Sequence, residues 1–179
     1  TRHKPILSGK SYLRVGSIDT GKMVIYPIVD ALDAHGTQLI NWVAEIKRDD
    51  ARMNDWNQGG AVGDFIDIFR DWHFDWLDVP ALIRDAEQIL EYPMVDKDPV
   101  PEWTFGRVTL LGDAAHPMYP RGSNGSAQAL IDGRTLADEL ARLPAGADPR
   151  TALKAYEMQR LPVTARIVET NRSVPPDFI

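Results

Sequence analysis

The stretch of sequence that decides the fold spans residues 106–133 and reads GRVTLLGDAAHPMYPRGSNGSAQALIDG. An apolar run at 108–111 predicts a β-strand that stops at Gly112-Asp113, and after a loop rich in Pro and Gly a helix is expected from about Ser126. A strand that ends in a carboxylate, followed by a glycine-rich turn and the start of a helix, can bind a polyhydroxylated, electron-accepting ligand. The carboxylate accepts hydrogen bonds from hydroxyl groups, and the glycines let the backbone approach the ligand. The helix start offers unpaired N–H groups and a partial positive charge.

The same stretch resembles the second flavin-binding motif of FAD-dependent aromatic hydroxylases of the para-hydroxybenzoate hydroxylase type. That motif is G-D-A-A-H followed by P-x-G-x-N-G, and here it reads GDAAH at 112–116 and PRGSNG at 120–125. The likeness covers nearly the whole chain. Three upstream segments look more similar still to the phenazine-hydroxylase branch: 40–46 (INWVAEI), 71–76 (DWHFDW) and 90–103 (LEYPMVDKDPVPEW).

Members of that family open with a strand and a GxGxxG turn that binds the ADP half of FAD. No such fingerprint occurs in this sequence. We therefore expect the chain to be the C-terminal portion of a larger enzyme, partnered by an N-terminal FAD-binding segment that is absent here. Alone, it is expected to bind flavin poorly.

Composition narrows the function classes. The 179 residues include 26 acidic and 20 basic side chains and no cysteine. The absence of a basic cluster argues against nucleic acid as a partner, and no apolar run reaches the ~18–20 residues of a membrane span. Without cysteine there are no disulfides and no cysteine-bound zinc, which is compatible with a cytoplasmic protein. The histidines lack ligand spacing, so no metal is expected, and a homo-oligomer remains open.

The expected fold class is α/β, in the form of an α+β arrangement within this chain. Residues 1–98 are predicted to form a substrate-binding sheet with helices, and 99–179 the C-terminal part of an FAD-binding domain. Alternation predicts an antiparallel sheet with one covered face. Its strands are expected at 11–18, 22–28 and 38–46, with a hairpin turn at Asp19-Thr20-Gly21 joining the first two. Helices at 64–72 and 79–88 and a short strand at 89–95 are expected to follow.

Two long helices are expected after the GDAAH motif. The first has an apolar stripe that begins at Ala127, and Pro144 to Gly146 ends it. The second follows the capping pair Asp148-Pro149, and Pro162 should kink it. The inward positions are predicted to be Leu130, Ile131, Ala137, Leu140 and Ala141 on the first helix, and Leu153, Tyr156, Val163 and Ile167 on the second.

The resemblance implies FAD as cofactor, NAD(P)H as reductant, and hydroxylation of an aromatic substrate with O2 through a flavin C4a-hydroperoxide. Because the cofactor carries the difficult chemistry, no catalytic residue is certain. By resemblance Asp113 binds a ribityl hydroxyl and Pro120 lines the reactive edge of the flavin, although a carboxylate at such a place also caps turns. The expected cofactor-binding residues are Gly112, Asp113, Pro120, Gly122, Ser123, Asn124, Gly125 and Ser126.

The substrate pocket is expected between the sheet and the flavin edge. Large side chains on segments that could line it are Tyr26, Trp42, Tyr92, Met94 and Tyr119. Core packing is the competing interpretation for such residues. Tyr119 and Arg121 could contact substrate or cofactor, or be exposed loop residues. His116 is interpreted as structural rather than as a general base.

Two other function classes fit the same residues. One is a flavoprotein of this fold with different chemistry, such as an oxidase, dehydrogenase or halogenase. The other is a non-catalytic binding domain that keeps the scaffold.

Overall fold

The computed structural model describes residues 11–29, 33–47, 59–92 and 94–174. The sequence predicts that Trp56 packs in the helical section after the sheet, but this residue lies outside the described residues. The chain divides into two compact units, Thr1–Pro93 and Met94–Ile179. We describe each unit separately.

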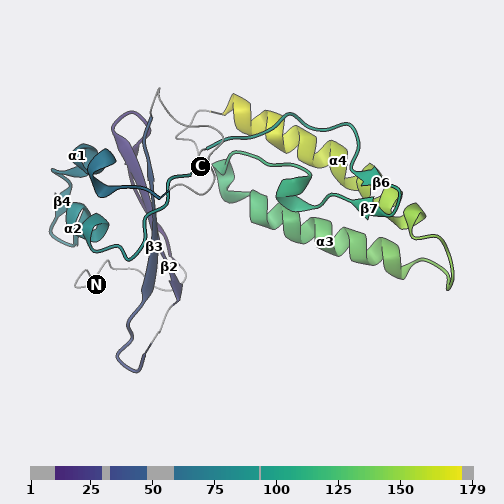
Figure 1. The fold of residues 1–179 in the computed structure, drawn as a ribbon, viewed down its shortest axis with the longest axis horizontal. Helices are drawn as coiled ribbons and strands as arrows, with labels where there is room; N and C mark the ends of the chain where they lie inside the picture. The colour runs from purple at the N-terminus through teal and green to yellow at the C-terminus, as the bar shows by residue number, and fades with distance from the viewer. Residues whose placement is uncertain (1–10, 30–32, 48–58, 93, 175–179) are drawn as a thin grey trace. The chain divides into compact units, whose positions relative to one another are not determined.

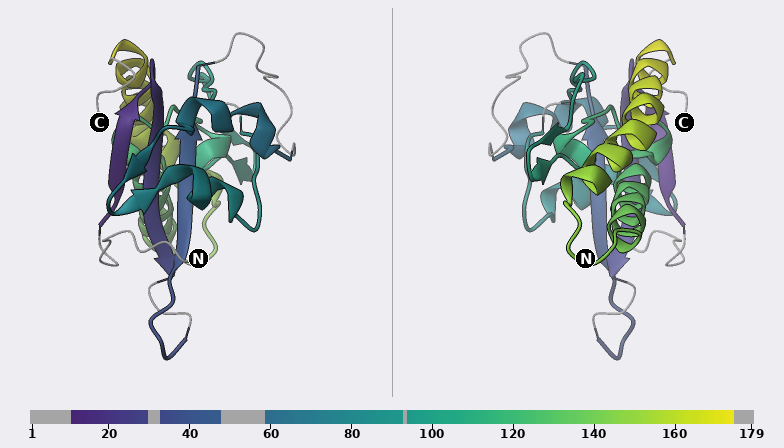
Figure 2. Two further views of the ribbon diagram at one scale, coloured as in Figure 1. Left: turned by 90° about the vertical axis from the view of Figure 1, so that its left-hand side faces the viewer. Right: turned by 90° about the vertical axis from the view of Figure 1, so that its right-hand side faces the viewer.

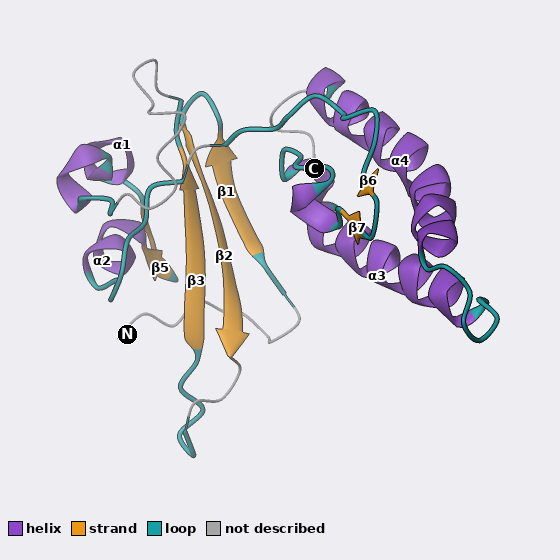
Figure 3. Ribbon diagram, turned by 45° about the vertical axis from the view of Figure 1, so that its right-hand side comes forward, coloured by secondary structure: helices purple, strands orange, loops and turns teal. Residues whose placement is uncertain are grey.

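The first unit contains an antiparallel sheet of three strands in the order β1-β2-β3, shown in Figure 3. Its strands are β1 (Leu13–Ser17), β2 (Gly21–Val29) and β3 (Leu39–Glu45). A tight turn joins β1 to β2, with Ser17 opposite Gly21. The three strands and this turn were predicted from the alternation and the turn residues, and both predictions are confirmed.

Short helices cover one face of this sheet, as Figures 1 and 2 show. The covering segment consists of η1 (Val62–Asp64), α1 (Ile66–Phe69), β4 (His73–Phe74), β5 (Leu77–Asp78) and α2 (Val79–Arg84). Asp78 caps α2, because its Oδ1 accepts a 2.9 Å hydrogen bond from the Ala81 amide. Pro80 in the first turn lacks an N–H that would need a partner there.

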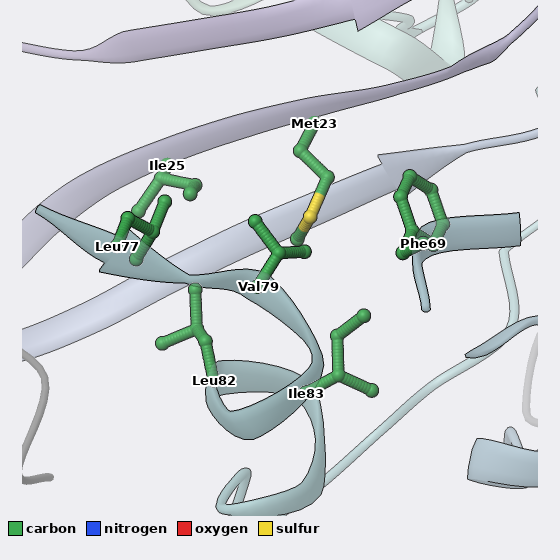
Figure 4. Packing of buried hydrophobic residues seen from close by; sticks show 7 residues of the cluster. All are labelled: Met23, Ile25, Phe69, Leu77, Val79, Leu82 and Ile83. Carbon is green, nitrogen blue, oxygen red and sulfur yellow. The ribbon is translucent and has the colours of Figure 1, made fainter. Parts of the chain in front are cut away.

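The core of this unit lies between the sheet and the covering segment. Figure 4 shows its buried members: Met23, Ile25, Phe69, Leu77, Val79, Leu82 and Ile83. On β3, alternate residues pack against this core, including Ile40, Trp42 and Ala44. The predicted sheet with one covered face is therefore confirmed.

Three predicted elements are shorter in the structure or missing. The helix expected at 64–72 is a 3-10 turn and a single α-turn, because Phe65 has φ −144° and interrupts the helix. The helix expected to reach 88 ends at Arg84. The strand expected at 89–95 is wrong, because among the described residues only Leu90 forms a bridge, to Gly59.

The second unit is built on two long helices that lie side by side, as seen in Figures 1 and 3. They are α3 (Gly125–Ala141) and α4 (Arg150–Ser173). A short hairpin of β6 (Thr104–Phe105) and β7 (Val108–Thr109) precedes them, so the strand expected at 108–111 is shorter than predicted. Both helix starts agree with the sequence prediction. No helix in the described part of the chain is long and apolar enough to cross a membrane.

The inward faces of the two helices differ from the prediction. All five apolar positions expected to face inward on α3 are exposed, and its buried residues are Gln128 and Asp132. On α4, Leu153 and Tyr156 are buried as predicted, but Val163 is exposed and Ile167 only half-buried. Burial on α4 instead continues through Arg160, Thr164 and Val168. The sequence prediction chose the wrong helix faces because it assumed that apolar residues face inward, whereas the buried faces carry polar residues.

The position of the hydrophobic core of the first unit can be tested by a substitution on β2. Replacing Ile25, which is 0% exposed, by Ala is expected to lower the free energy of unfolding by about 2–5 kcal/mol, because the lost methyl groups leave a cavity. Urea denaturation followed by circular dichroism measures this change. The matched control is Ile28→Ala on the same strand, where the side chain is 56% exposed. An equal loss at both positions would contradict the placement of the core.

Candidate functional site

The GDAAH motif forms a tight turn that packs on α3. Gly112 begins the 3-10 turn η2 (Gly112–Ala114), and its carbonyl accepts 2.9 Å hydrogen bonds from the amides of Ala115 and His116. Gly112 has φ +59°, and a Cβ at this position would lie 3.2 Å from the Cβ of Ala129. Only glycine suits both the left-handed backbone and this close approach to the helix.

A buried carboxylate on α3 holds this turn in place. One oxygen of Asp132, Oδ2, accepts a 3.1 Å bond from the Gly112 amide and lies 2.6 Å from Nε2 of His116. The other, Oδ1, accepts a 2.7 Å bond from Nε of Arg160 on α4. Asp132 is 0% exposed and Arg160 7%. The charge of the carboxylate is thus compensated inside the unit.

The same network extends to the start of α3. Arg160 also donates a 2.6 Å bond to Oε1 of Gln128, and Nε2 of Gln128 lies 3.3 Å from Oδ1 of Asn124. Gln128 therefore links Arg160 to the PRGSNG loop, while Asp132 links Arg160 to the GDAAH turn. The GDAAH turn and the PRGSNG loop are therefore both linked to Arg160 through one intervening side chain.

His116 has a structural position in this network, as the sequence interpretation expected. It is 3% exposed, and its ring packs against that of Trp103 at 5.6 Å between centroids. Its Nδ1 has no hydrogen-bond partner among the described residues. Tyr156 also packs against Trp103, at 5.7 Å between ring centroids, and donates a 3.2 Å hydrogen bond to the Leu110 carbonyl. Burial, and then the nearby Asp132 charge, raise the pKa of the Tyr156 phenol, which keeps it a donor.

A second buried carboxylate fixes the hairpin that leads into the motif. Oε2 of Glu157 accepts hydrogen bonds from the amides of Trp103 and Thr104, at 2.9 and 2.6 Å. Burial by itself raises the pKa of Glu157, but hydrogen bonds from Thr104, Trp103 and Lys154 outweigh it, so the pKa is lowered overall.

Asp113 and the start of α3 form an open corner. The Asp113 side chain is exposed, and no hydrogen bond joins it to another described residue. Its Oδ1 lies 3.9 Å from the point where a Cβ on Gly125 would stand. The carboxylate and the first turn of α3 are therefore neighbours, with no side chain on Gly125 to separate them.

The loop between Pro120 and Asn124 leaves backbone groups accessible. It contains the 3-10 turn η3 (Arg121–Ser123), in which Gly122 has φ +70° and Ser123 φ +51°. A Cβ at Gly122 would meet no atom within 4 Å, so open space adjoins the loop. No side chain caps α3. The N–H groups of its first turn are thus available to a ligand.

Arg121 faces the end of α4. Its Nη1 donates hydrogen bonds of 2.6 and 2.7 Å to the carbonyls of Asn171 and Val174, and its guanidinium lies 5.0 Å from the ring centre of Tyr119. The Tyr119 carbonyl in turn accepts a 3.1 Å bond from Nδ2 of Asn171. The interpretation of Arg121 as an exposed loop residue is therefore wrong.

Within the first unit, the structure places two of the residues expected in the substrate pocket, Tyr26 and Trp42, on opposite faces of the sheet. Trp42 packs against the core of the first unit and lies 6.0 Å from the ring of Phe65, which favours core packing over a pocket role. Tyr26 pairs with Asn41, so it lies on the opposite face of the sheet from Trp42. Tyr92 and Met94 are exposed, by 65% and 40%.

Sequence reasoning missed Asp132, Arg160, Gln128 and Glu157. The available signal was the helical spacing of polar side chains at 128 and 132 on one helix and at 157, 160 and 164 on the other. That spacing shows which residues share a helix face, but it does not show that the face is buried.

Known proteins match this chain in sequence. A family model described as an FAD binding domain matches residues 84–171. The phenazine 1,6-dicarboxylic acid hydroxylase PhzS of Lysobacter antibioticus is 44% identical over 169 residues, 93% of this chain and 41% of that protein. The 3-amino-4-hydroxybenzoate 2-monooxygenase PtmB3 of Streptomyces platensis is 38% identical over 158 residues, 88% of this chain and 37% of that protein.

By sequence the chain matches FAD-dependent aromatic hydroxylases over most of its length. The resemblance seen in the GDAAH and PRGSNG motifs is thereby confirmed. The chain spans about two-fifths of the length of the curated hydroxylases it matches.

Solved structures agree on the fold. The crystal structure of CtdE in complex with FAD superposes with a TM-score of 0.71 at 22% identity, covering 90% of this chain and 41% of that one. Klebsiella pneumoniae HpxO complexed with FAD and uric acid gives a TM-score of 0.60 at 22% identity, covering 93% of this chain and 39% of that one. These likenesses confirm the predicted α/β FAD-binding fold class of the hydroxylases.

The role of the Asp132 carboxylate can be measured by an isosteric change. Asp132→Asn is expected to lower the free energy of unfolding by about 3–5 kcal/mol, because it leaves the buried Arg160 without its counter-charge. Urea unfolding reports this loss. The matched control is Asp138→Asn, which breaks the pair of Asp138 with the 79%-exposed Arg134 on the same helix and should cost no more than about 1 kcal/mol. Equal effects would refute the stabilising role of the network.

Proposed function

We propose that the chain is part of an FAD-dependent monooxygenase that hydroxylates an aromatic carboxylate, with NAD(P)H as reductant and O2 as oxidant. The observation that carries the proposal is the open corner formed by Asp113, the Gly122 loop and the uncapped start of α3. The matched relatives support the substrate class: their names specify phenazine 1,6-dicarboxylic acid, 3-amino-4-hydroxybenzoate and 3-hydroxybenzoate.

The residues at this corner fit the riboflavin half of FAD. The exposed Asp113 carboxylate can accept hydrogen bonds from ribityl hydroxyls. The N–H groups of Gly122, Ser123, Asn124, Gly125 and Ser126 can donate to the polar edge of the flavin ring, and the absence of a side chain at Gly122 and Gly125 leaves room for it. Pro120 is exposed beside these groups and would line the ring.

The helix start favours negative charge on a ligand held there, by about 0.3–2 kcal/mol depending on burial. Reduced flavin carries such a charge at its pyrimidine edge, so this corner would stabilise the reduced form relative to the oxidised form. When bound, FAD supplies the electron transfer and the activation of dioxygen. The residues of the chain bind it, orient it and keep water away.

The exposed apolar stripe of α3 supports the proposal that the chain is one part of a longer polypeptide. Leu130, Ile131 and Leu140 are 76%, 45% and 41% exposed, and the stripe also includes Ala127, Ala137 and Ala141. Such a stripe on a 17-residue helix is typical of a surface that another layer covers. We propose that the remaining part of the FAD-binding domain, including its GxGxxG segment, packs there, since the relatives are more than twice as long.

The contribution of Asp113 can be isolated in the full-length protein. Asp113→Ala is expected to weaken FAD binding by about 1.5–3 kcal/mol, the range for a hydrogen bond to a charged group. Its effect on the free energy of unfolding should stay within about 0.5 kcal/mol, because the side chain is exposed. Fluorescence titration of the apoprotein measures the affinity, with the exposed Glu169→Ala on α4 as control. Unchanged FAD affinity would remove Asp113 from the site.

The proposed reaction is tested by turnover. The full-length protein with FAD should consume NAD(P)H faster when an aromatic carboxylate is added, and mass spectrometry with 18O2 should show one labelled oxygen atom in the product. Hydrogen peroxide as the sole product of O2 would indicate an oxidase instead. Failure to bind FAD would indicate a non-catalytic domain.

A further inference from the structure

We propose that Arg121 is a positioning residue that holds the loop from Pro120 to Asn124 against the C-terminal end of α4. We call this attachment the latch. The inference rests on the proposed FAD site and adds a residue outside the family pattern, which has no fixed residue type at this place in P-x-G-x-N-G. The side chain of Arg121 is directed to the end of α4 and to the Tyr119 ring. It acts by holding the backbone that presents those groups.

The latch consists of three hydrogen bonds on the two sides of Pro120. On one side, the Tyr119 carbonyl accepts a bond from Nδ2 of Asn171 at 3.1 Å. On the other, Nη1 of Arg121 donates to the carbonyls of Asn171 and Val174, at 2.6 and 2.7 Å. Pro120 is therefore fixed between two attachments to the same turn of α4. Gly122, which follows directly, has a backbone conformation that these attachments help to set.

The acceptors of Arg121 explain why an arginine is needed. The last carbonyls of a helix have no partner within the helix, and a cation at this end is favoured. Arg121 satisfies two such carbonyls with one nitrogen, and its flat guanidinium also stacks on the Tyr119 ring. A lysine would keep the charge but lose the stacking geometry.

The latch matters because the loop has few other restraints. The residues after it, Gly122 and Ser123, both have left-handed backbone, which is costly for a non-glycine residue such as Ser123. Within the backbone of residues 120–124, all of which the structure describes, one hydrogen bond joins the Ser123 amide to the Pro120 carbonyl, at 3.2 Å. Without Arg121, the loop can relax and its amides no longer point to one ligand position.

The test uses the full-length protein and compares Arg121→Met with Arg166→Gln. Methionine keeps the length of the side chain but removes its charge and donors. Arg166 lies on α4 and is exposed, so its replacement removes the same charge without touching the loop. Three quantities are measured: the Kd for FAD, the visible circular dichroism of bound FAD, and hydrogen exchange of the amides at 121–124 in the apoprotein.

For Arg121→Met we expect a Kd for FAD raised about tenfold or more, an altered flavin spectrum and faster amide exchange in the loop. Arg166→Gln should match the parent in all three. Arg121→Lys, which keeps a donor for the helix carbonyls, should restore part of the affinity. It also serves as the deciding variant if Arg121→Met does not fold.

Parental FAD affinity and parental loop exchange in the Arg121 variants would overturn the latch, as would an equal loss in Arg166→Gln. If the parent protein binds no FAD, the proposed function fails. The exchange measurement then still decides whether Arg121 holds the loop.

Discussion

The second unit depends on one buried ionic interaction, the Asp132 carboxylate with the Arg160 guanidinium. Removing a carboxylate from water costs several kcal/mol unless it is paired and its lone pairs are satisfied. Asp132 meets this condition because Arg160, the Gly112 amide and His116 all lie within hydrogen-bond distance of its oxygens. The pairing requires α3, α4 and the GDAAH turn to be in place together, so it specifies their arrangement as well as stabilising it.

Glu157 follows the same principle at the next segment of the chain. Each of the two carboxylates lies on a long helix and accepts backbone N–H bonds. Glu157 accepts them from Trp103 and Thr104 at the start of the hairpin, and Asp132 accepts one from Gly112 in the turn after the hairpin. The hairpin of β6 and β7 has only two residues in each strand. Charge-assisted bonds to helices therefore replace the ladder that would hold a longer strand.

The sequence predicted the sheet, its first turn and the starts of both long helices, because strand alternation, turn residues and the Gly- and Pro-rich segments before the helices act locally. It also located the cofactor motif, through the family resemblance. It failed on the inward faces of α3 and α4, because Asp132 is buried only by partners that are distant in sequence, such as Arg160. For Trp42 the sequence left a pocket role and core packing both open, because the alternation on β3 shows two faces but not which one the helices cover. The role of Arg121 depends on carbonyls at the end of α4, which no local pattern reveals.

The reversed amphipathicity of α3 has a consequence for how this helix can evolve. A helix on the surface of a protein normally has one side that accepts almost any polar residue. On α3 the polar side carries Gln128 and Asp132, whose hydrogen bonds leave no room for substitution. In the longer protein that we propose, the apolar side carrying Leu130 and Ile131 is covered as well. Sequence drift in α3 would then be restricted on both of these sides.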